Sequence, residues 1–327
     1  MGFAQPSGCP GLHELQEMWG EEKKKLQQMS RILHQRHHLL QVLRACFRDK
    51  GFLEVETPSL IESPALEEHI DAIPAEHCYL RTSPELHMKR MLAAGYSPIF
   101  QLGPCFRRKE SGSRHHPEFT MLEWYRQDAE LDQLIADTQD LVRDAAEKLT
   151  GNQHLTRGPG KKISLDPPWD TMTVDQAFQQ FAECHSVESA LSDGCFEEIL
   201  TQQVEPSLGT VRPLILRDFP IEMGGFAEKH NERQDRVQNW ELYIDGMEIA
   251  NACIEVTRHA EQNARFQKAA TVRQRQGRPI YAGDNCFEGA LLCEDLPSCA
   301  GIALGVDRLL MVLSNAERIQ DVRPFCE

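Results

Sequence analysis

The dipeptide Asp245–Gly246 lies between two strand-like segments, Trp240–Ile244 and Met247–Glu255. A two-residue Asp-Gly turn strongly indicates an antiparallel hairpin, because it supplies the positive φ angles that such turns need. A second, longer hairpin is predicted from the strand-like segments 99–107 and 118–125, which flank a polar loop. Long antiparallel strands mixed with helices predict an α+β fold rather than an alternating βαβ fold.

Helices are expected around these hairpins. Apolar residues at three- and four-residue spacing predict an amphipathic helix over 24–49, and further helices are predicted over 130–149 and 258–276. Ser83-Pro84-Glu85 predicts a helix start, with Ser83 as the capping residue. Residues 1–22 are interpreted as a loose leader. Residues 23–327 are interpreted as one domain, which carries a mostly helical insertion around 160–212 after a Gly-Pro-Gly linker.

Charge and cysteine content narrow the function classes. The chain has 35 Lys and Arg against 50 Asp and Glu, a net charge of −15, which disfavours non-specific binding to nucleic acids or anionic membranes. Its 11 cysteines contain no C-x-x-C pair, which is typical of free thiols in a reducing compartment. With no signal-peptide pattern and no apolar run long enough for a bilayer, a cytoplasmic location without membrane contact is predicted.

The second strand of the longer hairpin carries a candidate site. Because strand side chains alternate, Phe119, Met121, Glu123 and Tyr125 share one face. The acid suits an ammonium group and the aromatic ring suits a base, whereas the alternative interpretation is a core face with Glu123 paired to a surface arginine. Arg107, at the end of the partner strand, suits a two-pronged grip on phosphate or carboxylate.

The loop between these strands is a basic island in an acidic chain. It contains Arg108, Lys109 and Arg114, followed by His115 and His116. The loop is a candidate surface for a ligand or a partner, and the alternative interpretation is an ordinary solvated loop.

The shorter hairpin places two acids together. In a regular two-residue hairpin Glu241 and Glu248 fall on one face, within about 7–8 Å as diagonal neighbours. The pair indicates a divalent cation such as Mg²⁺, whereas the alternative is an exposed face where water screens both charges. Asn251 and Glu255 have the opposite parity. They join the same site only if a β-bulge lies near 249–252, and such a bulge is predicted.

A glycine-punctuated segment near the C-terminus, Gly301 to Gly305, leads into a helix that begins near Arg308. Its glycines allow close approach of a ligand, and the Arg308 guanidinium can lie over a planar base. The chain lacks both a Walker loop and a G-x-G-x-x-G segment after a strand, so use of ATP through a P-loop or a Rossmann fold is excluded.

In this order, the pieces resemble the catalytic core of class II aminoacyl-tRNA synthetases of the lysyl type. The segment up to Pro58 is similar to motif 1, Phe106 to Tyr125 to motif 2, and Gly301 to Arg308 to motif 3. The resemblance implies an antiparallel class II sheet flanked by helices, a catalytic domain over 23–327, and a homodimer formed through motif 1.

Within this class, the chain resembles a narrower group, the family of stand-alone elongation factor P–(R)-β-lysine ligases. Ser83 and Ala303 match that family where the synthetases have Ala and Gly, and the space before motif 1 is too short for an anticodon-binding barrel. The resemblance implies ATP-dependent activation of (R)-β-lysine or lysine as an acyl-adenylate, then transfer to a lysine of elongation factor P. A tRNA acceptor, which is disfavoured, and a non-catalytic amino-acid or ATP sensor remain the alternatives.

The resemblance also implies roles for individual residues. Arg107 and Arg308 are the expected catalytic residues, and Glu241 and Glu248 the expected Mg²⁺ ligands. The expected amino-acid pocket comprises Ser83, Pro84, Glu85, Glu123, Tyr125, Asn251, Glu255 and Ala303. The expected ATP site comprises Arg107, Arg108, Lys109, Glu110, His116, Phe119, Glu248, Ile249, Gly305 and Arg308.

This chain departs from the family pattern at several of these positions. Lys109 and His116 stand where an acid and an asparagine are expected, so Glu110 is the alternative residue for reading adenine. The segment 252–254, Ala-Cys-Ile, replaces a glycine and an aromatic pair beside Asn251 and Glu255. These departures leave the exact amino acid open.

Overall fold

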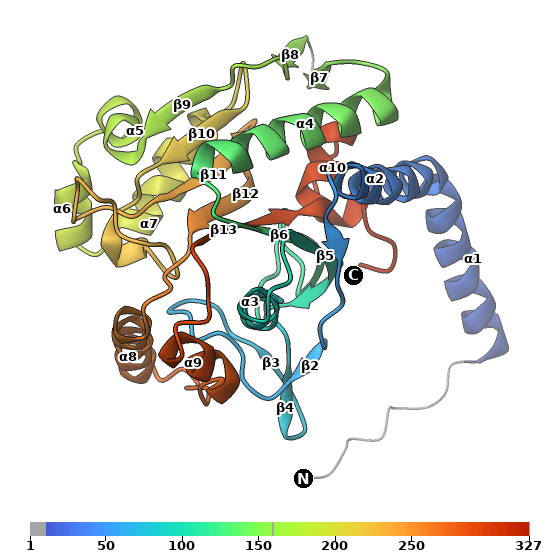
Figure 1. Ribbon diagram of the computed structural model, residues 1–327. Helices are drawn as coiled ribbons and strands as arrows, with labels where there is room; N and C mark the ends of the chain where they lie inside the picture. The colour runs from blue at the N-terminus through green and yellow to red at the C-terminus, as the bar shows by residue number, and fades with distance from the viewer. Residues whose placement is uncertain (1–10, 159, 327) are drawn as a thin grey trace.

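An eight-stranded sheet forms the centre of the computed structural model, which describes residues 11–158 and 160–326 (Figure 1). The strands run in the order β1-β5-β6-β13-β12-β11-β10-β9, and the pairs from β5 to β10 are antiparallel. Only the edge strands β1 and β9 pair in parallel. The predicted α+β fold with an antiparallel sheet is confirmed. The strands are β1 Leu53–Glu54, β5 Ile99–Phe106, β6 Glu118–Gln127, β9 Asp170–Thr173, β10 Leu214–Arg217, β11 Asn239–Ile244, β12 Met247–Ile254 and β13 Cys299–Gly305.

Two small sheets flank the large one. One joins β2 Leu60–Ile61, β4 Cys78–Leu80 and β3 Ile73–Ala75, and the other is the hairpin of β7 His154–Arg157 and β8 Lys161–Ser164. The helices are α1 Leu12–Gln28, α2 Ser30–Asp49, α3 Glu85–Ala93, α4 Leu131–Thr150, α5 Val174–Phe181, α6 Val187–Ser192, α7 Phe196–Ile199, α8 His259–Arg275, α9 Asn285–Leu292 and α10 Val306–Ser314. None of the helices in the described segments has the length and apolar composition required to cross a membrane.

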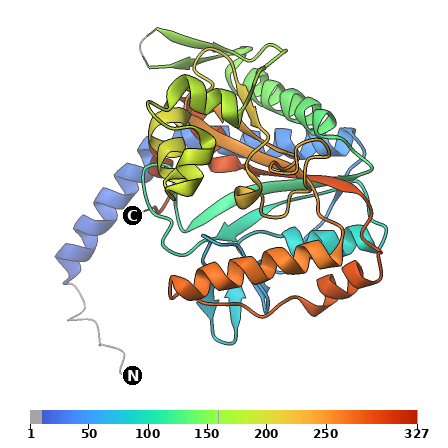
Figure 2. The same cartoon turned by 90° about the vertical axis from the view of Figure 1, so that its left-hand side faces the viewer.

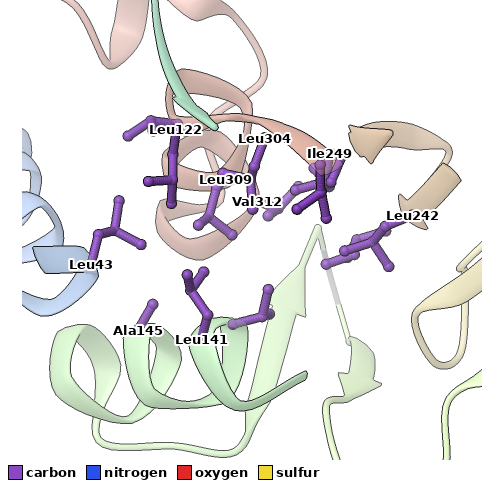
Figure 3. Packing of buried hydrophobic residues seen from close by; sticks show 14 of the residues in the cluster. Leu43, Leu122, Leu141, Ala145, Leu242, Ile249, Leu304, Leu309 and Val312 are labelled. Atoms are coloured by element: carbon purple, nitrogen blue, oxygen red, sulfur yellow. The ribbon is translucent and has the colours of Figure 1, made fainter. Parts of the chain in front are cut away.

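The large sheet separates two layers of helices. Helices α2, α4 and α10 cover one face, where Leu122 of β6 packs with Leu43, Leu141 and Leu309 from the three helices (Figure 3). Helices α3, α8 and α9 lie on the opposite side (Figure 2). Because side chains alternate along β6, Leu122 and Trp124 enter the first core while Glu123 and its odd-numbered neighbours face the second side. The second side of the sheet therefore carries the polar residues of β6 beside a smaller apolar cluster, which includes Ile99, Tyr125 and Met88.

The N-terminal region differs from the prediction. Residues 12–22 belong to helix α1 rather than to a loose leader, and residues 1–10 lie outside the described residues. The predicted single helix over 24–49 is also wrong, because α1 ends at Gln28 and α2 begins at Ser30. Helix α1 extends away from the sheet and has no buried residue, so only α2 contributes to the core (Figure 1).

The predicted insertion also differs in detail. Helices begin at Val174, later than predicted, because β8 and β9 occupy most of the segment from 161 to 173. Gly158 and Gly160 flank the turn between β7 and β8 rather than a linker, and Pro159 lies outside the described residues. Helices α5 to α7 pack with β10 around their own apolar cluster, which includes Phe178, Phe196 and Leu216. The ten cysteines between residues 11 and 326 are free thiols, as predicted.

A buried carboxylate ties helix α2 to motif 3. Asp307, in the first turn of α10, is 2% exposed. It accepts hydrogen bonds from Arg36 Nη1 at 2.5 Å, from the backbone N of Thr120 at 2.7 Å and from Arg323 Nη1 at 3.3 Å. Helix α2, strand β6 and the C-terminal segment therefore share one charged anchor.

We predict that Asp307→Ala lowers the free energy of unfolding by about 3–5 kcal/mol, because it removes the buried carboxylate that pairs with two guanidinium groups and accepts a hydrogen bond from a backbone N–H. Asp49→Ala is the matched control, since the Arg48–Asp49 pair is exposed and contributes about 1 kcal/mol or less. Urea denaturation of both variants measures the difference. Equal losses would contradict the anchoring role of Asp307.

Candidate active site

A cavity of about 350 Å³ lies over the polar face of the sheet, between β6, β12 and β13 and the motif 2 loop. Arg107, Glu248, Glu255 and Arg308 all line it. Arg107 follows β5, Glu248 lies on β12, Glu255 follows β12, and Arg308 lies in the first turn of α10. The antiparallel pairing of the central strands brings these four positions together.

A β-bulge on β12 produces this convergence. Tyr243 pairs with Glu248 and Leu242 pairs with Ala250, so Ile249 is an extra residue on β12. The bulge lies within the predicted segment 249–252. It shifts the parity of the strand, with the result that Glu248, Asn251 and Glu255 all line the same cavity.

The same bulge changes the partner of Glu241. The residue opposes Asn251, not Ala250 as a regular hairpin would require, and Asn251 Nδ2 donates a hydrogen bond to Glu241 Oε1 at 2.9 Å. Tyr243 Oη donates to the other carboxylate oxygen at 2.7 Å. Burial and the neighbouring charge of Glu248 raise the pKa of Glu241 to about 8. Two neighbouring carboxylates repel each other when both are ionised, and a divalent cation between them would remove this repulsion. Carboxylate oxygens are also the ligands that such cations prefer.

The motif 2 loop folds against the start of α10. Arg308 Nη1 donates to Glu248 Oε2 at 3.0 Å, and Arg308 Nη2 lies 2.5 Å from His115 Nε2. Burial, together with the charge of Arg308, lowers the pKa of His115, so the imidazole is neutral and can accept this bond. Arg114 donates to the backbone O of Gly246 at 2.7 Å and so fastens the loop to the shorter hairpin.

One end of the cavity concentrates guanidinium groups and an aromatic ring. The guanidinium carbon of Arg107 lies 5.1 Å from the centre of the Phe119 ring, and Arg308 lines the same cavity. Arg107 also lies 3.7 Å from Glu110. This end can bind an anionic group beside a planar ring.

The other end concentrates acids. Tyr125 Oη donates a hydrogen bond to Glu123 Oε1 at 2.7 Å. Burial and the nearby charge of Glu85 raise the pKa of Glu123 to about 8. Ala303 of β13 opposes both Glu123 and Asn251, so its methyl group lies at the wall between them. This end can bind ammonium groups.

Lys89 is a residue of this site that the sequence analysis missed. It is fully buried, with Nζ 2.6 Å from Glu85 Oε1, 2.5 Å from Glu255 Oε2 and 4.3 Å from the centre of the Phe226 ring. Its two carboxylate partners raise the pKa of Lys89 against the effect of burial. The four-residue spacing from Glu85 was the available sequence signal, because such a pair meets on one helix face.

Ser83 does not cap α3. Pro84 is the N-cap residue, and no side chain caps the helix. Ser83 Oγ is buried without a hydrogen-bond partner among residues 11–158 and 160–326, and the residue lines the cavity. The hydroxyl is therefore available to a ligand.

Most of the candidate residues meet in one place. Those lining the cavity are Ser83, Glu85, Arg107, Glu110, His116, Phe119, Glu123, Tyr125, Glu248, Ile249, Asn251, Glu255, Ala303, Gly305 and Arg308. Pro84 is buried at the start of α3, and Glu241 lies behind Asn251. Arg108 and Lys109 are exposed on the loop, outside the cavity lining.

Comparisons with known proteins indicate the family of this chain. A family model described as "tRNA synthetases class II (D, K and N)" matches residues 23–327. A protein of Photorhabdus laumondii is 35% identical over 311 residues, which cover 90% of this chain and 94% of the relative. A protein of Mannheimia succiniciproducens is 36% identical over 309 residues, again 90% and 94% of the two chains.

Both relatives are named elongation factor P–(R)-β-lysine ligase, as is a protein of Histophilus somni that is 34% identical over 86% of this chain and 91% of its own. The chain therefore belongs to the class II aminoacyl-tRNA synthetase family and, within it, to the family of elongation factor P–(R)-β-lysine ligases.

Proposed function

We propose that this protein is an ATP-dependent ligase that activates (R)-β-lysine or lysine and transfers it to a lysine side chain of elongation factor P. One observation carries the proposal: a single cavity has guanidinium groups and an aromatic ring at one end and carboxylates at the other. Such a cavity fits a nucleotide and a diamino acid side by side. The names of the relatives supply the acceptor protein.

In the activation step, a carboxylate oxygen of the amino acid attacks the α-phosphorus of ATP, and pyrophosphate leaves. Arg107 would stabilise the negative charge that develops on the phosphoryl oxygens, and Phe119 and Arg308 would hold the adenine between them. Glu110 and His116 line the cavity near this end, and they are the candidates for contacting adenine, with Arg108 and Lys109 flanking. Ile249 and Gly305 complete the wall.

Glu241 and Glu248 are the candidate residues for holding Mg²⁺. When bound, the ion supplies positive charge that neutralises the phosphates. Arg308 pairs with Glu248 at 3.0 Å, so a metal ion held by Glu248 would exchange one partner of this carboxylate for another.

The acidic end would bind the amino acid. Glu85, Glu123 and Glu255 carry three negative charges when ionised, and Lys89 supplies one positive charge, so 3 − 1 leaves two charges for the two ammonium groups of the substrate. Tyr125, Asn251 and the unpaired Ser83 hydroxyl add polar contacts. We further propose a cytoplasmic homodimer, with the dimer formed through motif 1.

Two measurements test the proposed function. ATP–pyrophosphate exchange with (R)-β-lysine or lysine reports activation, and a labelled amino acid reports the acceptor. The label is expected on elongation factor P and resistant to ribonuclease. Label on RNA would identify a tRNA ligase, and failure of every lysine isomer to support exchange would identify a sensor.

We predict that Arg107→Ala lowers the exchange rate by about 10²–10³-fold, because a group aimed at developing charge contributes this much to a reaction rate. Arg48→Ala is the matched control, since its side chain is exposed and outside the cavity lining, and it should stay within about threefold. Similar losses in both variants would argue against a specific role for Arg107.

We also predict that binding of the amino acid at pH 7 releases a proton from Glu123. With a pKa of about 8 this carboxyl is mostly neutral at pH 7, and an ammonium ligand favours its ionised form. Affinity should therefore rise with pH from 6 to 8, by up to about tenfold per unit. Calorimetric titration in buffers of different ionisation enthalpy measures the released proton.

Glu123→Gln should bind the amino acid more weakly and lose this proton release. Glu118→Gln, an exposed position on the same strand, should behave like the unmodified protein. A binding enthalpy of the unmodified protein that is identical in all buffers would refute the prediction.

A further inference from the structure

A second cavity of about 260 Å³ adjoins the first one. It lies between α8 and the segments 66–70 and 221–226, with Glu197 of α7 at its rim. Figure 2 shows α8, in orange, on the side of the sheet opposite to α4. Five residues line both cavities, and these are Glu67, Ile70, Met223, Gly225 and Phe226. The two cavities therefore share one wall.

The second cavity has an exposed polar mouth and a buried floor. His69, Glu197, Glu222 and Lys268 at the mouth are exposed. The floor is formed by buried residues, and these are Phe226, Gln262 and Ala269. Leu66, Ile70, Ile221 and Phe266 supply apolar walls between the two. This shape fits a side chain with an apolar stem that enters from the surface.

The charges of the cavity favour a cationic tip. Four carboxylates line it, Glu67, Glu68, Glu197 and Glu222, against the cations Arg265 and Lys268, so 4 − 2 leaves an excess of two negative charges when all four acids are ionised. Arg265 is already bound by Glu261 and by two backbone carbonyl groups. Lys268 lies 3.5 Å from Glu68 Oε1 and 3.3 Å from the backbone O of Glu222.

Gln262 provides an independent sign of a missing ligand. The residue is 1% exposed and lines the cavity, and its Oε1 has no hydrogen-bond partner within the described part of the chain. A buried carbonyl oxygen without a donor costs about 1–3 kcal/mol. An N–H donor placed in the cavity would remove this cost.

Glu67 stands at the wall between the two cavities. Burial raises the pKa of its carboxyl to about 7, opposed by the positive charges of Arg107 and Arg273 and reinforced by Glu85 and Glu110. The remaining charged neighbours around the cavity are Glu68, His69, Glu197, Glu222, Arg265 and Lys268. Glu67 lines the active-site cavity together with Arg107 and Glu85, so it borders the proposed phosphoryl site.

We propose that the second cavity admits the acceptor lysine of the protein substrate, and that Glu67 takes the proton from its ammonium group at the wall between the cavities. This inference rests on the proposed function. The apolar stem of the lysine would pack on Ile70 and Phe226, as long cationic side chains do on apolar surfaces. The excess carboxylates and the Gln262 carbonyl oxygen would attract the ammonium group inward.

The transfer step begins with loss of a proton from the acceptor lysine. The Glu67 carboxylate accepts one proton from the lysine ammonium, and the neutral amine attacks the carbonyl carbon of the acyl-adenylate. A C–N bond forms, and the C–O bond to the adenylate phosphate breaks. The second proton leaves the nitrogen as the tetrahedral intermediate collapses, and it passes to a phosphate oxygen of the departing AMP.

The experiment uses the full chain loaded with its acyl-adenylate and mixed with elongation factor P in a single turnover. Glu67→Gln should slow transfer at pH 7 by about 10²–10⁴-fold, the usual contribution of a general base. It should leave ATP–pyrophosphate exchange within about threefold. Glu62→Gln, at an exposed carboxylate of the same segment that lines neither cavity, is the matched control and should keep both rates within about threefold.

The pH profile separates a proton acceptor from a merely structural residue. With Glu67 present, the transfer rate should rise with pH and level off above about pH 7. In Glu67→Gln the rate should keep rising toward the pKa of a free lysine amine, about 10.4, by about tenfold per unit. As a second probe, Ala269→Met, which narrows the cavity from its floor, should raise the KM for the acceptor protein at least about tenfold and leave exchange unchanged.

Three results would overturn the inference. They are equal slowing of exchange and transfer in Glu67→Gln, no effect of this substitution on either rate, and an unchanged pH profile. A complete absence of exchange in the unmodified protein is a different result, because it would refute the proposed function itself.

Discussion

The extra residue on β12 is the constraint on which the site depends. Side chains on a strand alternate, so a strand without the bulge would place Glu248 and Glu255 on opposite faces of the sheet. With Ile249 inserted, both acids line one cavity, and Asn251 reaches Glu241 behind them. The apolar core on the other face fixes the register, because a slip of one residue would send Leu242 and Ala250 out of that core.

A second close fit joins β13 to the acidic end of the cavity. Gly301 pairs with Tyr125, and a Cβ atom at position 301 would lie 2.3 Å from the Tyr125 ring and 2.5 Å from Glu255 Oε1. Both distances are shorter than any side chain tolerates, so this strand position requires glycine for steric reasons. Gly301 therefore leaves free the space that the Tyr125 ring and the Glu255 carboxylate occupy.

Much of the fold and the site could be predicted from local sequence. Hairpins with a clear turn and alternating strands, such as the one around Asp245–Gly246, are determined by near neighbours, and the bulge followed from a parity argument on four polar residues. Features that depend on contacts between residues far apart in the sequence were not predictable in this way. The break between α1 and α2 at the buried Met29, and the position of Pro84 rather than Ser83 at the N-cap of α3, were therefore missed.

Lys89 illustrates the same limit and has a further consequence. In the sequence, a lysine within a helix is indistinguishable from a solvated surface residue. Only the structure shows that Glu255 Oε2 lies 2.5 Å from Lys89 Nζ. Because its ammonium group pairs with both Glu85 and Glu255, replacing Lys89 would leave two neighbouring carboxylates without their buried counter-charge. Lys89 can therefore change only together with its partners. New amino-acid specificities in this lineage are expected to evolve through uncharged positions of the wall, such as Cys253 and Ala303, where a single substitution alters shape without disturbing the charge balance.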